Sequence, residues 1–220
     1  MITVSSLTLA IIGAFGFSYI EPTLENGETK VDPAIVSVLS MTGRGTGFFI
    51  EKEGTKYLVT AAHVCTSSPI LLSARGIHRV LLSRPDKDIC ISTTFQGVET
   101  LTLGADVKPG DNIYMTGFPG NLTYDYQKGT ARDVGVSDFL LPHHFYSAEA
   151  ACPPLSLSLE KECRVYITTI ELAILARPGN SGGPVQNDAG EVVGILIGTN
   201  FKYGYMTPVS ELTGLLNGKP

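Results

Sequence analysis

Residues 179–184 read Gly179-Asn180-Ser181-Gly182-Gly183-Pro184, so that small residues crowd a single hydroxyl. Glycine on either side lets the backbone bend close to a ligand and turn its N–H groups inward. Serine is a poor nucleophile at neutral pH, and it needs a base within hydrogen-bond reach and donors for the oxyanion that forms after attack. We therefore interpret Ser181 as a candidate nucleophile. The alternative is an ordinary turn residue.

The base for this serine is expected in the segment Thr60-Ala61-Ala62-His63-Val64-Cys65, which follows a strand-like run at residues 56–60. His63 alone has a second interpretation, as a histidine satisfied in the core. Its occurrence together with the serine segment favours a role as general base, because the hydroxyl proton needs an acceptor.

A third group must hold the imidazole in one tautomer and stabilise its charged form. Asp88 fits this role, because it immediately precedes the apolar run Ile89-Cys90-Ile91, which is typical of a buried strand. Asp86 is the weaker candidate, since Lys87 separates it from that run. The alternative for Asp88 is an acid at the edge of a strand.

The order His63, Asp88, Ser181 and the sequence around each residue resemble the chymotrypsin-fold serine proteases, over roughly residues 32–215. Within that fold the chain is most similar to the bacterial HtrA-like (Deg) branch. The matching segments are residues 45–50, 117–120, 177–184 and 204–209. At 220 residues, the chain is expected to lack the C-terminal peptide-binding (PDZ) module of the longer HtrA-like proteins.

This resemblance implies an all-β fold of two six-stranded antiparallel β-barrels, with the active site in the cleft between them. Residues 32–105 would form the N-terminal barrel, with His63 and Asp88, and residues 106–220 the C-terminal barrel, with Ser181. The implied activity is hydrolysis of peptide bonds through an acyl-enzyme, without a cofactor or a metal.

Asn180 stands where the zymogen-activated trypsins carry an aspartate that pairs with a newly cut amino terminus. A neutral amide cannot form that ion pair, so we do not interpret Ile11-Ile12-Gly13-Ala14 as a cleavage-generated terminus. We expect the backbone N–H groups of Gly179 and Ser181 to be the oxyanion donors, and the hole to form without such a cut.

By the same resemblance, the primary specificity pocket has its floor and walls from Leu175, Ala176, Ile197, Gly198, Thr199 and Gly204. None of these residues is acidic, so a Lys or Arg side chain would find no partner there. We expect cleavage after small or medium apolar residues of peptides or unfolded polypeptides.

Composition favours the same fold class. With 24 Gly and 13 Pro, the chain consists of short β-rich runs separated by turn signals. The runs predicted as strands are 35–39, 47–50, 80–82, 89–91 and 98–103 in the first barrel and 113–115, 164–170, 192–197 and 203–206 in the second. The net charge is −5 and the 16 basic residues are dispersed, which argues against a nucleic-acid partner.

The N-terminal segment carries no charged side chain from residue 2 to residue 20. A helix of that length would nearly cross a hydrocarbon core of about 30 Å. We expect residues 1–20 to be a signal peptide or a membrane anchor, residues 21–31 to be a linker, and the protein to be secreted, extracytoplasmic or anchored. The alternative is a poorly packed N-terminus, because the segment lacks a basic region.

The four cysteines leave the redox compartment open. Cys152 and Cys163 bracket a Pro- and Ser-rich loop, and a bridge between them would contribute roughly 2 to 3 kcal/mol by restricting the unfolded chain. Cys65 and Cys90 each follow a candidate catalytic residue by two positions. These two are expected to be buried free thiols beside the site.

The other histidines suggest no metal site. His78 is interpreted as an exposed strand position and His143-His144 as part of a loop, and no metal-binding pattern accompanies them. The stretch 137–162 is longer than the corresponding connection in the family. It is a lid or partner-binding loop on one interpretation and a surface insertion on the other.

Two other functions compete with proteolysis. A peptide-binding protein on the same fold, without activity, has no need for all of His63, Asp88 and Ser181. An esterase with the same three residues is disfavoured, because the serine segment differs from the Gly-x-Ser-x-Gly elbow of the α/β-hydrolases and the chain lacks their alternating helices.

Overall fold

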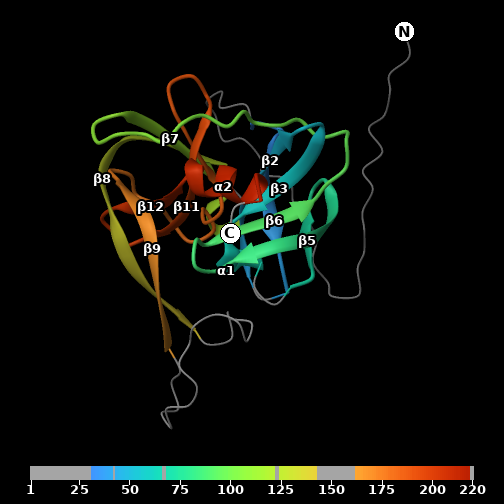
Figure 1. The fold of residues 1–220 in the computed structure, drawn as a ribbon, viewed down its shortest axis with the longest axis horizontal. Helices are drawn as coiled ribbons and strands as arrows, with labels where there is room; N and C mark the ends of the chain where they lie inside the picture. Colours follow the sequence, from blue (N-terminus) through green and yellow to red (C-terminus); the bar gives the residue numbers. More distant parts are fainter. Residues whose placement is uncertain (1–30, 42, 66–67, 122–123, 143–161, 219–220) are drawn as a thin grey trace.

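The computed structural model describes residues 31–41, 43–65, 68–121, 124–142 and 162–218. Its strands form two closed antiparallel barrels of six strands each, which lie side by side in Figure 1. This architecture confirms the all-β, two-barrel fold expected from the sequence. Closing a sheet on itself pairs the strands that would otherwise be its exposed edges.

The first barrel has the spatial strand order β1-β2-β3-β6-β5-β4. The bounds are Ile35–Leu39 (β1), Arg44–Lys52 (β2), Thr55–Thr60 (β3), Ile70–Ser73 (β4), Gly76–Arg84 (β5) and Ile89–Thr93 (β6). Pairing of Leu39 with Leu72 closes the ring. The short helix α1 (Ala62–Cys65) directly follows β3.

Strand β2 shows how one segment serves two cores. Phe48, Phe49 and Ile50 are all fully buried. Successive side chains of a strand point to opposite faces. Phe49 therefore packs with Val38 and Leu58 in a cluster of first-barrel residues, whereas Phe48 and Ile50 join a cluster shared with the second barrel.

The second barrel has the spatial order β10-β11-β12-β9-β8-β7. The bounds are Asn112–Gly117 (β7), Asp125–Pro142 (β8), Glu162–Leu172 (β9), Pro184–Gln186 (β10), Val192–Thr199 (β11) and Gly204–Pro208 (β12). Pairing of Val185 with Met115 closes this ring. A 3₁₀ turn, η1 (Pro119–Asn121), follows β7, and helix α2 (Val209–Leu216) follows β12.

The two barrels share an apolar cluster. Phe48 and Ile89 from the first barrel pack with Ile195 of β11 and with Leu212 and Leu215 of α2. Removing this apolar surface from water stabilises one relative position of the barrels. A site divided between them depends on that position.

The predicted strand at residues 98–103 is wrong. Isolated bridges join Leu101 to Ile50 and Leu103 to Val192, but no strand forms in this run. Its alternation arises because Leu101 and Leu103 are half-buried against the shared cluster while the chain crosses between the barrels. Strands β4, β8 and β10 were not predicted.

The prediction of an exposed His78 is also wrong. The side chain is fully buried on β5, and its ring packs against those of Phe49 and Phe95. Its ring nitrogens lie 2.8 Å from Ser73 Oγ and 3.2 Å from the Thr93 carbonyl oxygen. Burial lowers the pKa of His78, which makes it a neutral core residue.

Several expectations fall outside the described residues. These are the signal peptide or anchor, the linker apart from residue 31, the Cys152–Cys163 bridge and the pair His143-His144. The ends of the stretch 137–162 belong to β8 and β9. In the part of the chain that the structure describes, no helix has the length and apolar character needed to cross a membrane.

Candidate active site

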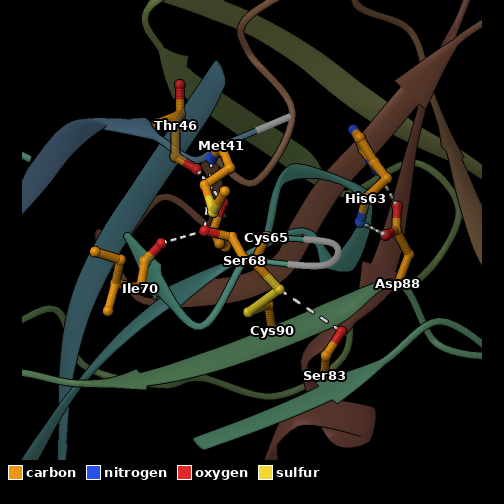
Figure 2. Close-up of a disulfide and its surroundings, with 10 residues drawn as sticks. Met41, Thr46, His63, Cys65, Ser68, Ile70, Ser83, Asp88 and Cys90 are labelled. Carbon is orange, nitrogen blue, oxygen red and sulfur yellow. Dashed lines mark hydrogen bonds and ion pairs between the residues drawn. A yellow bond between two sulfur atoms is a disulfide. The ribbon is translucent and has the colours of Figure 1, made fainter. Parts of the chain in front are cut away.

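His63 lies on α1, and its imidazole contacts the carboxylate of Asp88. Nδ1 of His63 lies 2.7 Å from Oδ2 of Asp88, and the backbone N–H of His63 donates to Oδ1 at 2.8 Å. Both carboxylate oxygens therefore bind the same residue, as Figure 2 shows. This contact favours a proton on Nδ1 and leaves Nε2 available as the acceptor.

The backbone before β6 turns sharply to bring Asp88 to His63. The φ angle of Asp88 is 51°, in the left-handed region, and its N–H donates to the Pro85 carbonyl at 3.2 Å. Its side chain is 4% exposed. Asp86 instead binds Arg84 through both carboxylate oxygens, at 2.9 and 2.8 Å. The structure thus brings Asp88, and not Asp86, to the imidazole.

The surroundings of His63 act on its pKa in opposite directions. Burial lowers the pKa by disfavouring the imidazolium, whereas the charge of Asp88 and the hydrogen bond to it raise the pKa. The result is a pKa above the ordinary value of 6.5. Such an imidazole can take up a proton near neutral pH and keep it as a charged pair with Asp88.

Ser181 lies in the loop between β9 and β10, and hydrogen bonds fix the carbonyl groups next to it. All five carbonyls from residue 177 to residue 181 accept a hydrogen bond. In chain order the donors are the Asn180 N–H, the Gly120 N–H, the Thr46 hydroxyl, the Gly183 N–H and the Thr46 N–H, at 3.0, 3.1, 2.8, 2.9 and 2.8 Å.

The N–H groups of Gly179 and Ser181, by contrast, have no acceptor among the described residues. Each belongs to a trans peptide whose carbonyl, of Pro178 or Asn180, is already bonded. The carbonyl and N–H of a trans peptide point in opposite directions, so these bonds turn both N–H groups away from the internal contacts of the loop. Two open donors in this arrangement suit a developing oxyanion.

The serine loop and α1 approach each other across Gly45 of β2. A Cβ atom on Gly45 would lie 2.6 Å from both the Ser181 carbonyl oxygen and a methyl of Val64. Only glycine therefore permits this approach. Among the described residues, no hydrogen bond joins the Ser181 hydroxyl to His63.

Asn180 is fully buried, and its side-chain N–H₂ donates to Oδ2 of Asp125 at 3.2 Å. The same carboxylate oxygen accepts from Gln127 Nε2 at 2.8 Å. Gln127 in turn binds both the carbonyl and the N–H of Leu175, at 2.9 and 3.2 Å. A network thus links the nucleophile loop to an expected pocket residue, and no local sequence signal marks Asp125 or Gln127.

The expected pocket residues gather around β11 and β12. Thr199 pairs with Gly204, which also pairs with Leu172 of β9. The side chains of Ala176 and Ile197 are buried, whereas that of Leu175 is 49% exposed. A polar pocket of about 220 Å³ lies elsewhere, and its lining includes Asp86, Lys87, Tyr166, Thr168 and Glu211.

The expectation of free thiols at Cys65 and Cys90 is wrong, because these residues form a disulfide with their Cα atoms 6.4 Å apart. Figure 2 shows the bridge beside His63 and Asp88. Each cysteine lies two positions after one member of that contacting pair, so the contact brings the cysteines within bridging range. Their equal offset was the sequence signal for this bridge, and it was misinterpreted as two separate thiols beside the site.

Across the described ranges, no group of three or more His, Cys, Asp or Glu side chains could hold a metal ion. The arrangement instead offers an imidazole held by a carboxylate, a serine hydroxyl and two open N–H donors. Groups of these kinds are the ones that acyl transfer requires.

The chain is similar in sequence to known peptidases. Residues 45–195, more than half of the chain, match the trypsin-like peptidase domain. A probable periplasmic serine endoprotease, DegP-like, from Halomonas elongata is 28% identical over 159 residues, which cover 69% of this chain and 28% of that protein. Protease Do-like 2, chloroplastic, of Arabidopsis thaliana is 27% identical over 200 residues, covering 81% of this chain and 29% of that protein. The chain thus spans less than a third of the length of these relatives.

Solved structures share the fold at lower identity. The active form of the Rv3671c protease from M. tuberculosis has a TM-score of 0.65 and 20% identity, covering 84% of this chain and 80% of that one. The HtrA-type protease AlgW with a tripeptide has a TM-score of 0.62 and 20% identity, covering 84% and 60%. At these identities the likeness shows the double-barrel fold alone. The match over residues 45–195 shows more: this chain belongs to the trypsin-like peptidase family and is similar to its HtrA-type, DegP-like members.

Proposed function

We propose that this protein is a serine endopeptidase that hydrolyses peptide bonds through an acyl-enzyme on Ser181. His63 acts as general base and then as general acid, and Asp88 orients and stabilises its charged form. One observation carries the proposal. The chain belongs to a peptidase family, and its His63 imidazole contacts the Asp88 carboxylate. In the loop around Ser181 the backbone carbonyls accept hydrogen bonds, whereas the N–H groups of Gly179 and Ser181 have no acceptor among the described residues.

The reaction follows from these groups. Ser181 Oγ attacks the scissile carbonyl carbon while its proton passes to Nε2 of His63, and the carbonyl oxygen becomes an oxyanion held by the N–H groups of Gly179 and Ser181. The C–N bond then breaks as His63 gives its proton to the leaving amine. Water attacks the acyl-enzyme with His63 again as base, and Ser181 is released with its proton.

Substrates are proposed to be peptides or unfolded polypeptides cleaved after small or medium apolar residues. Support comes from the apolar character of Leu175, Ala176 and Ile197 and from the lack of an acid among the expected pocket residues. On β11, Gly198 and Thr199 pair with β12, while the pairing with β10 ends at Ile195. A substrate strand can add on the side that β10 leaves unpaired.

An extracytoplasmic location is proposed from two observations. The Cys65–Cys90 disulfide is characteristic of proteins in oxidising compartments. The relative from Halomonas elongata is named as periplasmic and that from Arabidopsis thaliana as chloroplastic.

Covalent labelling by a fluorophosphonate, mapped by peptide mass spectrometry, tests the proposal directly. Labelling confined to Ser181, abolished in Ser181→Ala and strongly slowed in His63→Ala, is the expected result. Cleavage of a peptide library by the wild type would then define the residue preferred before the scissile bond. A folded wild-type protein that is neither labelled nor able to cleave any library member would overturn the proposal and favour a peptide-binding role.

A further inference from the structure

We propose that Thr46 is a positioning residue for the oxyanion donors, an inference that rests on the proposed peptidase function. Thr46 lies on β2 of the first barrel and is fully buried. Its hydroxyl donates to the Gly179 carbonyl at 2.8 Å and accepts from the Phe118 N–H at 2.9 Å. One side chain of the first barrel thus joins two segments of the second half of the chain at the nucleophile loop.

The direction of both bonds is determined by their partners. A backbone N–H can only donate and a carbonyl can only accept, so the hydroxyl hydrogen of Thr46 must point at Gly179. The Gly179 carbonyl belongs to the peptide between the two peptides that carry the open N–H groups. Holding this central peptide sets the angle between its neighbours, and therefore the direction in which each donor points.

The rest of Thr46 is fixed independently of its hydroxyl. Its N–H donates to the Ser181 carbonyl at 2.8 Å, and its carbonyl accepts from the Thr60 hydroxyl at 2.6 Å. A Cβ atom on Gly182, whose φ is 85°, would overlap both the Thr46 carbonyl oxygen and the Thr60 hydroxyl. The backbone of β2 is therefore held against the loop, and removing the Thr46 hydroxyl acts mainly on its two partners, the Gly179 carbonyl and the Phe118 N–H.

Valine in place of Thr46 keeps the shape of the side chain but leaves the Gly179 carbonyl and the Phe118 N–H without their partner. Buried polar groups without partners are costly, so the central peptide will turn to find another donor. The left-handed φ of Gly179, 100°, offers glycine the freedom to do so. The Gly179 N–H would then leave the position that an oxyanion needs.

This role predicts a specific kinetic pattern. Oxyanion donors act only when negative charge develops, so misplacing one lowers kcat while KM changes little. Complete loss of one such donor lowers kcat by about 10²- to 10³-fold in comparable enzymes. For Thr46→Val we expect a loss of at least about tenfold in kcat and in the rate of Ser181 labelling, with KM within about threefold of wild type.

The experiment compares Thr46→Val with Thr46→Ser, which restores the hydroxyl, and with Thr213→Val as the matched control. Thr213 makes a similar hydroxyl-to-carbonyl bond, to Val209 at 3.0 Å, within α2. Circular dichroism and thermal unfolding establish that each variant is folded. We expect Thr46→Ser and Thr213→Val to keep kcat within about threefold of wild type. If Thr46→Val does not fold, Thr46→Ala carries the same comparison.

The outcomes separate two failures. If the wild type is labelled at Ser181 and Thr46→Val matches it in kcat, the positioning role is overturned while the peptidase function stands. The same conclusion follows if Thr46→Ser is as impaired as Thr46→Val, or if the loss lies wholly in KM. If the folded wild type is never labelled and cleaves nothing, the proposed function itself fails.

Discussion

The two halves of the proposed site are held together by different means. On the first barrel, His63 and Asp88 bind each other through side chains, and the Cys65–Cys90 disulfide lies beside them. On the second, the loop around Ser181 is held by hydrogen bonds to its backbone carbonyls and by close packing around glycines. The first half therefore depends on charge and a covalent bond, and the second on the fit of small groups.

This difference implies that the halves will fail in different ways. Substitutions that change charge or break the disulfide will act on the first half. Additions of one or two carbon atoms will act on the second, because its contacts leave no room. The variants below use this contrast, from the largest expected effect to the smallest.

Asp88→Asn is expected to have the largest effect on the first half. The substitution keeps the shape but removes the charge that stabilises the His63 imidazolium, and in a comparable triad it lowers kcat by about 10⁴-fold. Asp86→Asn is the matched control, because Asp86 binds Arg84 on the surface. Peptide cleavage by both variants, with folding checked by circular dichroism, measures the contrast. Equal activities of the two variants would show that Asp88 does not orient the base.

Replacing both cysteines of the disulfide, Cys65→Ala with Cys90→Ala, is expected to act on stability first. A bridge between residues 25 positions apart lowers the entropy of the unfolded chain, and its loss costs roughly 3 to 4 kcal/mol. Urea unfolding monitored by fluorescence or circular dichroism measures this loss. At urea concentrations well below the midpoint of unfolding of the variant, kcat should be less than about tenfold lower than in the wild type, because the bridge does not touch the reacting atoms. A change in stability below about 1 kcal/mol would contradict the expectation.

Gly182→Ala tests the fit of the second half, and Gly190→Ala is its control. Both glycines have φ in the left-handed region, 85° and 77°, but only a Cβ on Gly182 meets other atoms. The conformational strain of about 1 to 2 kcal/mol is common to both, whereas the overlap adds about 1 to 3 kcal/mol at Gly182 alone. Urea unfolding of the two variants should differ by that overlap. Equal destabilisation would show that the loop has room to move.

The smallest of the expected effects is a shift in the pH at which kcat/KM rises. His63 is protonated and cannot act as base below its pKa, so activity should rise as pH increases through that pKa. Because Asp88 holds the pKa above 6.5, the midpoint of this rise should also lie above 6.5. Asp88→Asn should move the midpoint to lower pH in its residual activity. A wild-type midpoint clearly below 6.5 would mean that burial outweighs the charge of Asp88.

Sequence reasoning succeeded for strands whose apolar residues are mostly buried. Ile35–Leu39 and Ile89–Thr93 contain predicted runs of this kind, and both form strands. It failed for Asp125–Pro142, because Val134 and Val136 on this strand are exposed and leave no buried periodicity. It also misread residues 98–103, where half-burial imitates a strand.

The residues of the proposed site also differ in how far the sequence reveals them. The segments around His63, Asp88 and Ser181 carry their signal in neighbouring residues. Asp125 carries none, because its partner Asn180 lies 55 positions away. Thr46 belongs to the matching segment 45–50, but nothing in that segment indicates its partner Gly179, which lies 133 positions away. Only the folded chain identifies such contacts.

The separation of 133 positions between Thr46 and Gly179 also has a consequence for the order of folding. Contacts between distant positions close the longest loops and form late. The His63–Asp88 pair, 25 positions apart, closes a much shorter loop and is expected to form earlier. A partly folded chain would then carry only one half of the proposed site. We expect the loop around Ser181 to reach its final shape only when the last strands are in place.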